Sequence, residues 1–284
     1  MTSQFELGRR FRSLHDSGHG IFVIPNPWDG ASARMLASLG FKALATSSSA
    51  SAATLGYRDG CIGREEALAH VRLIAGATDL PVSADLENGF GDAPEEVAEA
   101  VRAVAEAGAV GCSIEDSWRG HVGGLYDFDL AVRRIEAAAD AARALAFPFT
   151  LTARTEEFLA GGSNLDETIR RLRAFEAAGA DVLFAPGLRD LGTVRAVCAA
   201  VSKPVNYMIG MKGASFSLAQ LRDAGVRRVS LSTALFRSAM AGLHEAAREA
   251  AAGTFEFAER AMDSKVIAGM LRSEIQRERR REPD

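Results

Sequence analysis

Short apolar runs alternate with longer amphipathic runs along most of this chain. The short runs are rich in β-branched residues, whereas the longer runs are rich in alanine and repeat their apolar positions at helical spacing. The predicted strands span residues 21–25, 43–46, 82–85, 111–115, 150–153, 182–185, 205–208 and 228–231. The predicted helices span residues 31–39, 64–77, 94–107, 130–145, 165–178, 193–202, 218–224 and 234–251. This alternation is typical of a parallel α/β fold.

Glycine recurs where a predicted helix gives way to the next strand. Gly108, Gly179 and Gly225 each follow an alanine at such a point, and we expect each to end its helix in a left-handed turn. The units repeat without a break in composition, which favours one (β/α)8 TIM barrel domain over residues 1–284. A doubly wound sheet is the alternative, but its usual Gly-x-Gly-x-x-Gly after the first strand is missing. Residues 253–284 predict a C-terminal helical extension with no strand to cover.

Composition and charge narrow the class of protein. The chain has 284 residues, 48% hydrophobic and 25% charged, with a net charge of −4, so we expect an ordinary globular protein that binds no nucleic acid. Its three scattered cysteines predict neither a disulfide framework nor a zinc site. No apolar run is long enough for a membrane span, and the first residues do not resemble a signal peptide. We therefore expect a cytoplasmic protein with no membrane partner.

Polar residues gather directly after the predicted strands, where a barrel of this kind keeps its active site. The segments are Asn-Pro-Trp-Asp at 26–29, Thr-Ser-Ser-Ser at 46–49, Asp-Leu-Glu-Asn at 85–88, Glu-Asp-Ser at 115–117, Arg-Thr-Glu at 154–156 and Asn-Tyr at 206–207. Several carboxylates facing one mouth would repel one another unless a cation lay between them. Oxygen ligands without His or Cys point to Mg²⁺, with Mn²⁺ as the alternative.

Some of these residues have a structural interpretation. Asp29 is expected to cap the helix at 31–39 rather than to react. Asp85 and Glu87 could likewise serve only to cap a helix, and the serines at 47–49 could be loop residues. Arg154 follows a buried strand and is costly to bury alone, so we expect a carboxylate partner, either Glu115 or the substrate.

Five segments together resemble the isocitrate lyase and phosphoenolpyruvate mutase superfamily over roughly residues 23–232. They read NPWDGASARMLASLGFKALATSSSASAATLGYRDG, SADLENGFGD, SIEDS, LTARTE and PVNYM. The resemblance implies a Mg²⁺-dependent barrel that binds an α-keto acid or its enolate. It also implies a homo-oligomer, a dimer of dimers in which the last helix is exchanged between subunits.

The resemblance also implies roles for individual residues. By position, Asp85 matches a direct metal ligand, and Glu87 and Glu115 match ligands that act through water. Asp59 matches an acidic residue near the metal, and Arg154 matches the arginine that holds the substrate's oxygens. Substrate contacts are implied for three further residues, Ser47, Ser48 and Asn206.

The segment after the fourth strand departs from the family pattern. The lyases carry a catalytic cysteine there, and the phosphonate enzymes a lysine, but residues 118–126 contain neither. His121 and Tyr126 are the candidate proton donors in their place.

We therefore expect a Mg²⁺-dependent lyase that cleaves or decarboxylates a small α-keto or hydroxy di-acid such as oxaloacetate, without an organic cofactor. The alternatives are a C–P bond enzyme, of the phosphonopyruvate hydrolase or phosphoenolpyruvate mutase type, and a barrel that binds a keto acid without catalysis. Substrate identity and the type of bond broken stay open.

Overall fold

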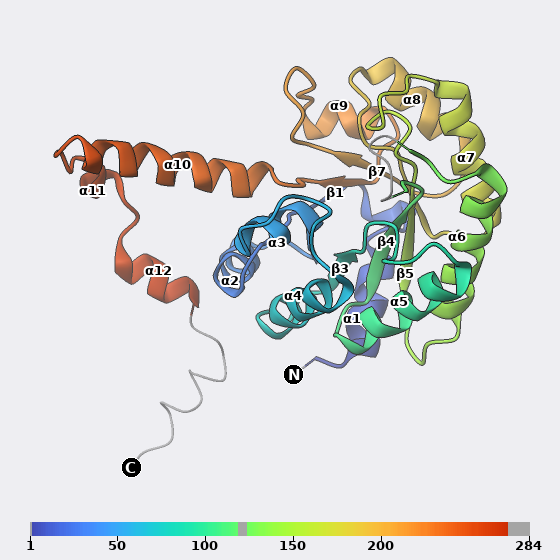
Figure 1. Cartoon of the computed structure of the whole chain (residues 1–284), viewed down its shortest axis with the longest axis horizontal. Helices are drawn as coiled ribbons and strands as arrows, with labels where there is room; N and C mark the ends of the chain where they lie inside the picture. Colours follow the sequence, from blue (N-terminus) through green and yellow to red (C-terminus); the bar gives the residue numbers. More distant parts are fainter. Residues whose placement is uncertain (1, 119–123, 272–284) are drawn as a thin grey trace, which may run out of the picture.

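Eight parallel strands form the centre of the computed structural model, which describes residues 2–118 and 124–271 (Figure 1). The strands are β1 Phe22–Ile24, β2 Leu44–Ala45, β3 Val82–Asp85, β4 Gly111–Glu115, β5 Thr150–Arg154, β6 Val182–Phe184, β7 Val205–Met208 and β8 Arg228–Ser230. Their order in the sheet is β1-β8-β7-β6-β5-β4-β3-β2, so each strand lies beside its neighbour in sequence, and β1 lies beside β8. The predicted (β/α)8 TIM barrel is confirmed.

Polar contacts close the barrel between β1 and β2. The Ala45 N–H donates to the carbonyl of Pro25 at 3.0 Å. The Asn26 amide links the end of β1 to both flanking strands, because its nitrogen donates to the Thr46 carbonyl after β2 at 2.9 Å and its oxygen accepts from the Leu231 N–H after β8 at 3.0 Å. Asn26 therefore has a structural part to play at the barrel mouth.

Helices surround the barrel or extend from it, and where the apolar spacing predicted a helix, the observed bounds are close to the predicted ones. They are α1 Gln4–Ser13, α2 Gly30–Ser38, α3 Ser48–Thr54, α4 Arg64–Gly76, α5 Pro94–Glu106, α6 Phe128–Arg143, α7 Leu165–Ala177, α8 Leu191–Ala200, α9 Leu218–Asp223, α10 Ala234–Ala251, α11 Phe257–Arg260 and α12 Ser264–Leu271. The side chains of Val97 and Val104 on α5 and of Ile135 on α6 are buried in the main core. Each such burial contributes about 1.5–3 kcal/mol.

Glycine ends the helices as the sequence predicts. Gly108, Gly179 and Gly225 have φ angles of 102°, 103° and 97°, in the region that residues with a Cβ rarely adopt. Asp29 also behaves as expected, since its carboxylate accepts the Ser32 N–H at 2.6 Å and caps α2.

Helix α1 was not predicted, and it covers the amino-terminal end of the barrel. Phe11 on α1 is fully buried and packs with Ile24 and Val110. A Cβ on Gly111 would lie 2.8 Å from the Phe11 ring, so the start of β4 needs a glycine to admit that ring. Helix α3 was also missed, because its run of serine and alanine resembles a loop.

The predicted helix at residues 234–251 is confirmed as α10, but most of α10 and the helices after it do not cover the barrel (Figure 1). Helix α10 extends away from it, and α11 and α12 return along the outside towards α2 (Figure 1). None of the residues of α10 is buried within this chain, and Leu243 and Phe255 are well exposed. The first turn of α10 contacts the barrel, because Leu235 packs against the core cluster that contains Leu36 and Ile74, and the Phe236 ring lies 5.5 Å from that of Trp28. A search of the described helices finds none long and apolar enough to cross a membrane.

Candidate active site

A hollow opens at the carboxyl ends of the strands and brings together residues from β1 to β8. The residues that line it are Ile24, Asn26, Ala45, Thr46, Ser47, Ser83, Ala84, Asp85, Ser113, Arg154, Phe184, Asn206, Met208, Arg228, Ser230 and Ser232. Of the predicted site residues, four line it directly, namely Ser47, Asp85, Arg154 and Asn206.

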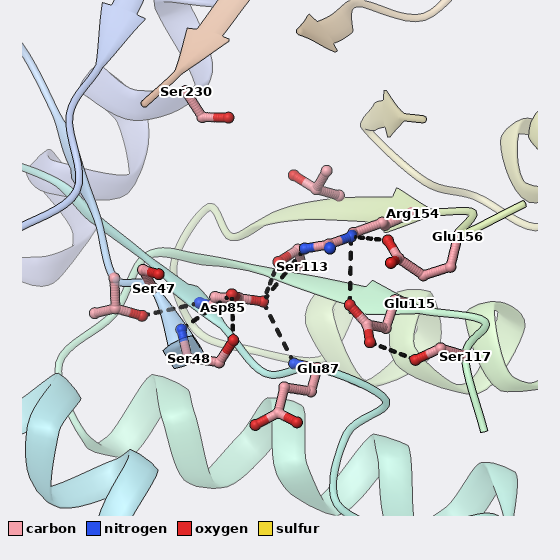
Figure 2. Close-up of polar contacts among 12 residues, drawn as sticks. Ser47, Ser48, Asp85, Glu87, Ser113, Glu115, Ser117, Arg154, Glu156 and Ser230 are labelled. Atoms are coloured by element: carbon pink, nitrogen blue, oxygen red, sulfur yellow. Dashed lines mark hydrogen bonds and ion pairs between the residues drawn. The ribbon is translucent and has the colours of Figure 1, made fainter. Parts of the chain in front are cut away.

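The Asp85 carboxylate lies at the end of β3 and is fixed by hydrogen bonds. Ser48 donates to Oδ2 through both its backbone N–H, at 3.1 Å, and its hydroxyl, at 3.0 Å. On the other oxygen, Oδ1 accepts from the Ser113 hydroxyl at 3.3 Å and from the Glu87 N–H at 3.4 Å. Figure 2 shows these donors converging on Asp85 from three separate elements. The carboxylate is therefore held in one orientation at the wall of the hollow.

Arg154, at the end of β5, contacts three carboxylates. Its Nε lies 3.3 Å from Oε2 of Glu115 and also bonds Glu156, while Nη1 lies 4.0 Å from Oδ1 of Asp85 (Figure 2). The predicted partnership with Glu115 is confirmed. The Phe184 ring lies beneath the guanidinium, with its centroid 5.1 Å from Cζ. Such contacts fix a planar guanidinium in position.

The charges of this cluster do not balance. Asp85, Glu115 and Glu156 share one arginine, and each of the four side chains is at most 17% exposed. If all are ionised, two negative charges are in excess. Burial raises the pKa of Glu115 to about 8, with Glu156 and Asp85 adding to the rise and Arg154 opposing it. Burial opposes the charge on Arg154, but the surrounding carboxylates prevail and raise its pKa above the usual value.

Asp59 and the serine segment lie at the edge of this cluster. The Ser48 hydroxyl is 3.4 Å from Oδ1 of Asp59. Burial, together with the nearby Asp85 charge, raises the pKa of Asp59. Ser47 caps α3 by accepting the Ala50 N–H at 3.3 Å, and Ser48 begins that helix. The N–H of Ser48 is thus directed at Asp85.

Asn206 belongs to the opposite side of the hollow. Its amide nitrogen donates to the Ser230 hydroxyl at 3.0 Å, and its oxygen accepts from Nε of Arg228 at 2.9 Å. In Figure 2, Ser230 stands apart from the group around Asp85 and Arg154. The predicted substrate contact at Asn206 therefore faces the predicted metal ligands across the hollow.

These geometric features agree with comparisons to known proteins. A sequence model of the family described as phosphoenolpyruvate phosphomutase matches residues 11–251. This chain belongs to that family. The result confirms the resemblance to the phosphoenolpyruvate mutase and isocitrate lyase superfamily, and with it the expectation of an enzyme.

Relatives in this family are named as lyases and decarboxylases. The chain is 33% identical, over 78% of its length and 74% of the relative's, to a Corynebacterium glutamicum protein that carries the provisional name 2-methylisocitrate lyase 2. It is 32% identical to the oxaloacetate decarboxylase of Paraburkholderia xenovorans, covering 87% of this chain and 83% of that one. Among solved structures, a provisionally assigned lyase/mutase from Burkholderia cenocepacia superposes with a TM-score of 0.92 at 49% identity, covering 95% and 97% of the two chains.

The family's expected metal ligands are not arranged as a direct cage. Within residues 2–118 and 124–271, no group of three or more His, Cys, Asp and Glu side chains could hold a metal ion as it stands. Glu87 has a φ of 50°, and its carboxylate points away from Asp85 while its backbone N–H faces it (Figure 2). This arrangement fits a metal ion bound directly by one carboxylate, with the other carboxylates contacting it through water, better than an ion bound directly by all of them.

The two candidate proton donors differ in what the structure offers. His121 lies outside the described residues. Tyr126 is buried away from the hollow, where its hydroxyl donates to Asp92 at 2.5 Å and accepts from Asn88 at 2.9 Å. The Arg134 guanidinium covers its ring at 4.1 Å. Burial and the Asp92 contact raise the pKa of Tyr126 to about 12, so this phenol is a structural residue rather than an acid for substrate.

No role was predicted for Ser113, Glu156 or Arg228. A signal for them was present, because inward-facing positions of a strand recur at every second residue. Ser113 precedes Glu115 by two residues, and Glu156 follows Arg154 by two. Arg228 precedes Ser230 by two residues. Ser113 and Arg228 lie two residues before a strand end, whereas Glu156 lies two residues beyond the end of β5.

Proposed function

We propose that this chain is a divalent-metal-dependent lyase that cleaves or decarboxylates a small α-keto or hydroxy di-acid of the oxaloacetate type. The observation that carries the proposal is the buried cluster in which Asp85, Glu115 and Glu156 share the single cation of Arg154. A bound cation would favour the ionised form of Glu115. The cluster's two excess negative charges would then match the charge of one Mg²⁺ or Mn²⁺ ion, whose preferred ligands are carboxylate oxygens.

The residues present fit such an ion in a specific way. Asp85 would bind it directly, because its carboxylate is already oriented at the wall of the hollow. Glu115 and Glu87 are both predicted to contact the ion through water molecules. When bound, the ion supplies positive charge beside the keto oxygen, where negative charge develops as the substrate bond breaks. No organic cofactor is needed for this chemistry.

The protein's own residues would orient the substrate. In decarboxylation of a β-keto acid, the bond between the α-carbon and the leaving carboxylate breaks, and CO₂ leaves. The electron pair moves into an enolate, whose α-carbon then takes a proton from solvent or from the candidate acid His121. Arg154 would hold the substrate's carboxylate oxygens, since its guanidinium is fixed by Glu115 and Phe184. The serine segment at 47–48 keeps Asp85 in place and borders the same hollow.

Decarboxylation suits this chain better than an aldol-type cleavage. The segment 118–126 has neither the cysteine of the lyases nor the lysine of the phosphonate enzymes, and loss of CO₂ requires less help from an acid at the leaving group. The similarity to an oxaloacetate decarboxylase supports the same choice. A C–P bond enzyme and a binding protein without turnover remain the alternatives, and His121 remains the candidate acid.

A substrate panel tests the proposal directly. Oxaloacetate, phosphonopyruvate, methylisocitrate, isocitrate and 2,3-dimethylmalate would each be incubated with Mg²⁺, Mn²⁺ or EDTA, and the products measured. We expect metal-dependent release of CO₂ or of a cleavage product from one di-acid. Turnover of phosphonopyruvate alone would select the C–P alternative. Metal-dependent oxalate binding without any turnover would select the binding protein.

The exposed helices support an oligomer of this chain. Helix α10 has no buried residue, and exposed apolar side chains on and beyond it include Leu243, Phe255 and Met262. We propose that a second copy covers this surface, with the helices exchanged between subunits. Light scattering should give a mass above that of one chain, and replacing Leu243 and Phe255 by Glu should lower it. A monomeric wild-type protein would refute the exchange.

A further inference from the structure

Arg228 is a buried cation inside the barrel, and neither the family resemblance nor the proposed function uses it. It begins β8, with Asn206 as its neighbour in register on β7. Its side chain crosses the interior, and Nη2 donates to the Thr152 hydroxyl on β5 at 3.0 Å. The residue is 5% exposed, yet it borders the same hollow as Asp85 and Arg154.

The partners of Arg228 are all neutral. Besides Thr152 and the Asn206 amide oxygen, Nη1 lies 3.4 Å from Nε2 of His15. The other ring nitrogen of His15, Nδ1, is 2.9 Å from the Phe11 carbonyl, which can only accept, so Nδ1 carries the proton and Nε2 faces Arg228 as an acceptor. Among the described residues, no carboxylate forms an ion pair with Arg228, in contrast to Arg154.

This arrangement fixes which way the Asn206 amide points. Because Arg228 donates to the amide oxygen, the amide nitrogen must face the other way, and it donates to the Ser230 hydroxyl. That hydroxyl oxygen accepts from Asn206, so its own proton is available to a group in the hollow. Hydrogen bonds therefore run from Arg228 through Asn206 to Ser230, and all three residues line the hollow that the Ser230 hydroxyl proton can face.

A buried charge without a counter-charge is costly to the free protein. Burial lowers the pKa of Arg228 to about 9, which still leaves the guanidinium positively charged at neutral pH. The cost would be recovered when an anion enters the hollow, because the attraction between charges is strong where water is excluded. Such an anion would lie on the β7–β8 side, opposite the carboxylate cluster.

We propose that Arg228 is the positioning and specificity-determining residue that makes the β7–β8 side of the hollow select substrates with a second carboxylate. It orients the Asn206 amide with its N–H towards that carboxylate, and it supplies the positive charge beneath it. The inference rests on the proposed function, since it assumes that a keto or hydroxy acid occupies the hollow.

The test compares two ligands that differ by one carboxylate. Malate and lactate would be titrated in the presence of Mg²⁺ into the wild type and into Arg228→Met, and the ratio of their affinities measured by calorimetry. We expect the substitution to weaken malate binding by about tenfold or more and lactate binding much less. Arg228→Lys keeps the charge but loses the fixed guanidinium geometry, so it should retain part of the preference.

A matched control separates this role from simple loss of a buried arginine. Arg134 is also buried, but it donates to backbone carbonyls, such as those of Gly91 and Asp92, and does not line the hollow. Arg134→Met should reduce stability yet leave the ratio of the malate and lactate affinities unchanged. An equal change of that ratio in both variants would overturn the proposal.

The Asn206→Asp variant provides a second test of the proposal, and this test does not depend on how well Arg228→Met folds. The new carboxylate would pair with Arg228, so the melting temperature should rise, while the repelled malate should lose affinity. A lower melting temperature with unchanged malate preference would refute the inference. If the wild type binds lactate and malate equally, only this inference fails, whereas binding of neither ligand together with no turnover in the substrate panel would overturn the proposed function as well.

Discussion

The two sides of the barrel mouth carry opposite charge imbalances. On the β3–β5 side, Asp85, Glu115 and Glu156 share one arginine, whereas on the β7–β8 side Arg228 has only neutral partners. Neither side is balanced by itself, although both are buried. A barrel selected only for stability would pair these charges within the protein. Under the proposed function, a cation would complete one side of the hollow and an anionic group of the substrate the other.

Removing the central carboxylate should break the acidic side of this comparison and give the largest effect. In Asp85→Ala, we expect metal-dependent turnover to fall roughly 1,000-fold or more, because the direct ligand of the ion is lost. Steady-state rates and metal titrations would measure the loss, and circular dichroism should show an intact fold. Asp190→Ala, which removes an exposed cap of α8, should keep its activity. Full activity in Asp85→Ala would exclude the metal assignment.

Replacing Arg154, which the three carboxylates share, should give the next largest effect. Arg154→Lys keeps the charge among the three carboxylates but cannot keep the planar contacts with Glu115 and Phe184. We expect turnover to drop on the order of 100-fold, with metal affinity changed far less. Arg170→Lys, at an exposed helical ion pair, is the control. If both variants matched the wild type, Arg154 would have only a structural role.

The β7–β8 side should affect how the free energy of unfolding depends on pH. Burial lowers the pKa of His15 to about 3, and the Arg228 charge adds to this. The folded value is below the unfolded one of about 6.5, so the unfolded chain binds the proton first and stability falls as pH drops below about 6.5. The contribution is at most about 1.4 kcal/mol per pH unit.

Urea denaturation of the wild type and of His15→Gln between pH 7 and pH 5 would isolate that slope. Glutamine can still accept from Arg228 but does not titrate, so the variant should lose less stability on acidification. Parallel curves for the two proteins would show that His15 is not held neutral by its surroundings.

The smallest effect concerns one hydrogen bond on the acidic side. Ser113→Ala removes the hydroxyl that donates to Oδ1 of Asp85 at 3.3 Å, while Ser48 still holds Oδ2. The loss is about 1 kcal/mol, or roughly fivefold in metal affinity. A metal titration followed by calorimetry would measure it. An effect as large as that of Asp85→Ala would mean that Ser113 does more than orient the carboxylate.

The repeating units, the helix ends and many of the site positions could be predicted from local chemistry. Apolar spacing placed strands that agree with β3, β4 and β7, and Asp29 was correctly expected to cap α2. Helix α3 was missed because its run of serine and alanine has no apolar spacing, although Ser47 caps it at the barrel mouth. Helix α10 was predicted with the observed bounds, but its direction away from the barrel was not predicted (Figure 1).

By itself, the sequence determined the fold class, the family and the set of acidic residues at the strand ends, because each depends on patterns a few residues long. The tertiary structure alone decided the partners of those residues. Strands far apart in the chain meet at one mouth, so Arg154 contacts Asp85 from β3 and Glu115 from β4, and Arg228 reaches Thr152 across the barrel. Charge balance depends on distances between such residues, and those distances exist only once the barrel has closed.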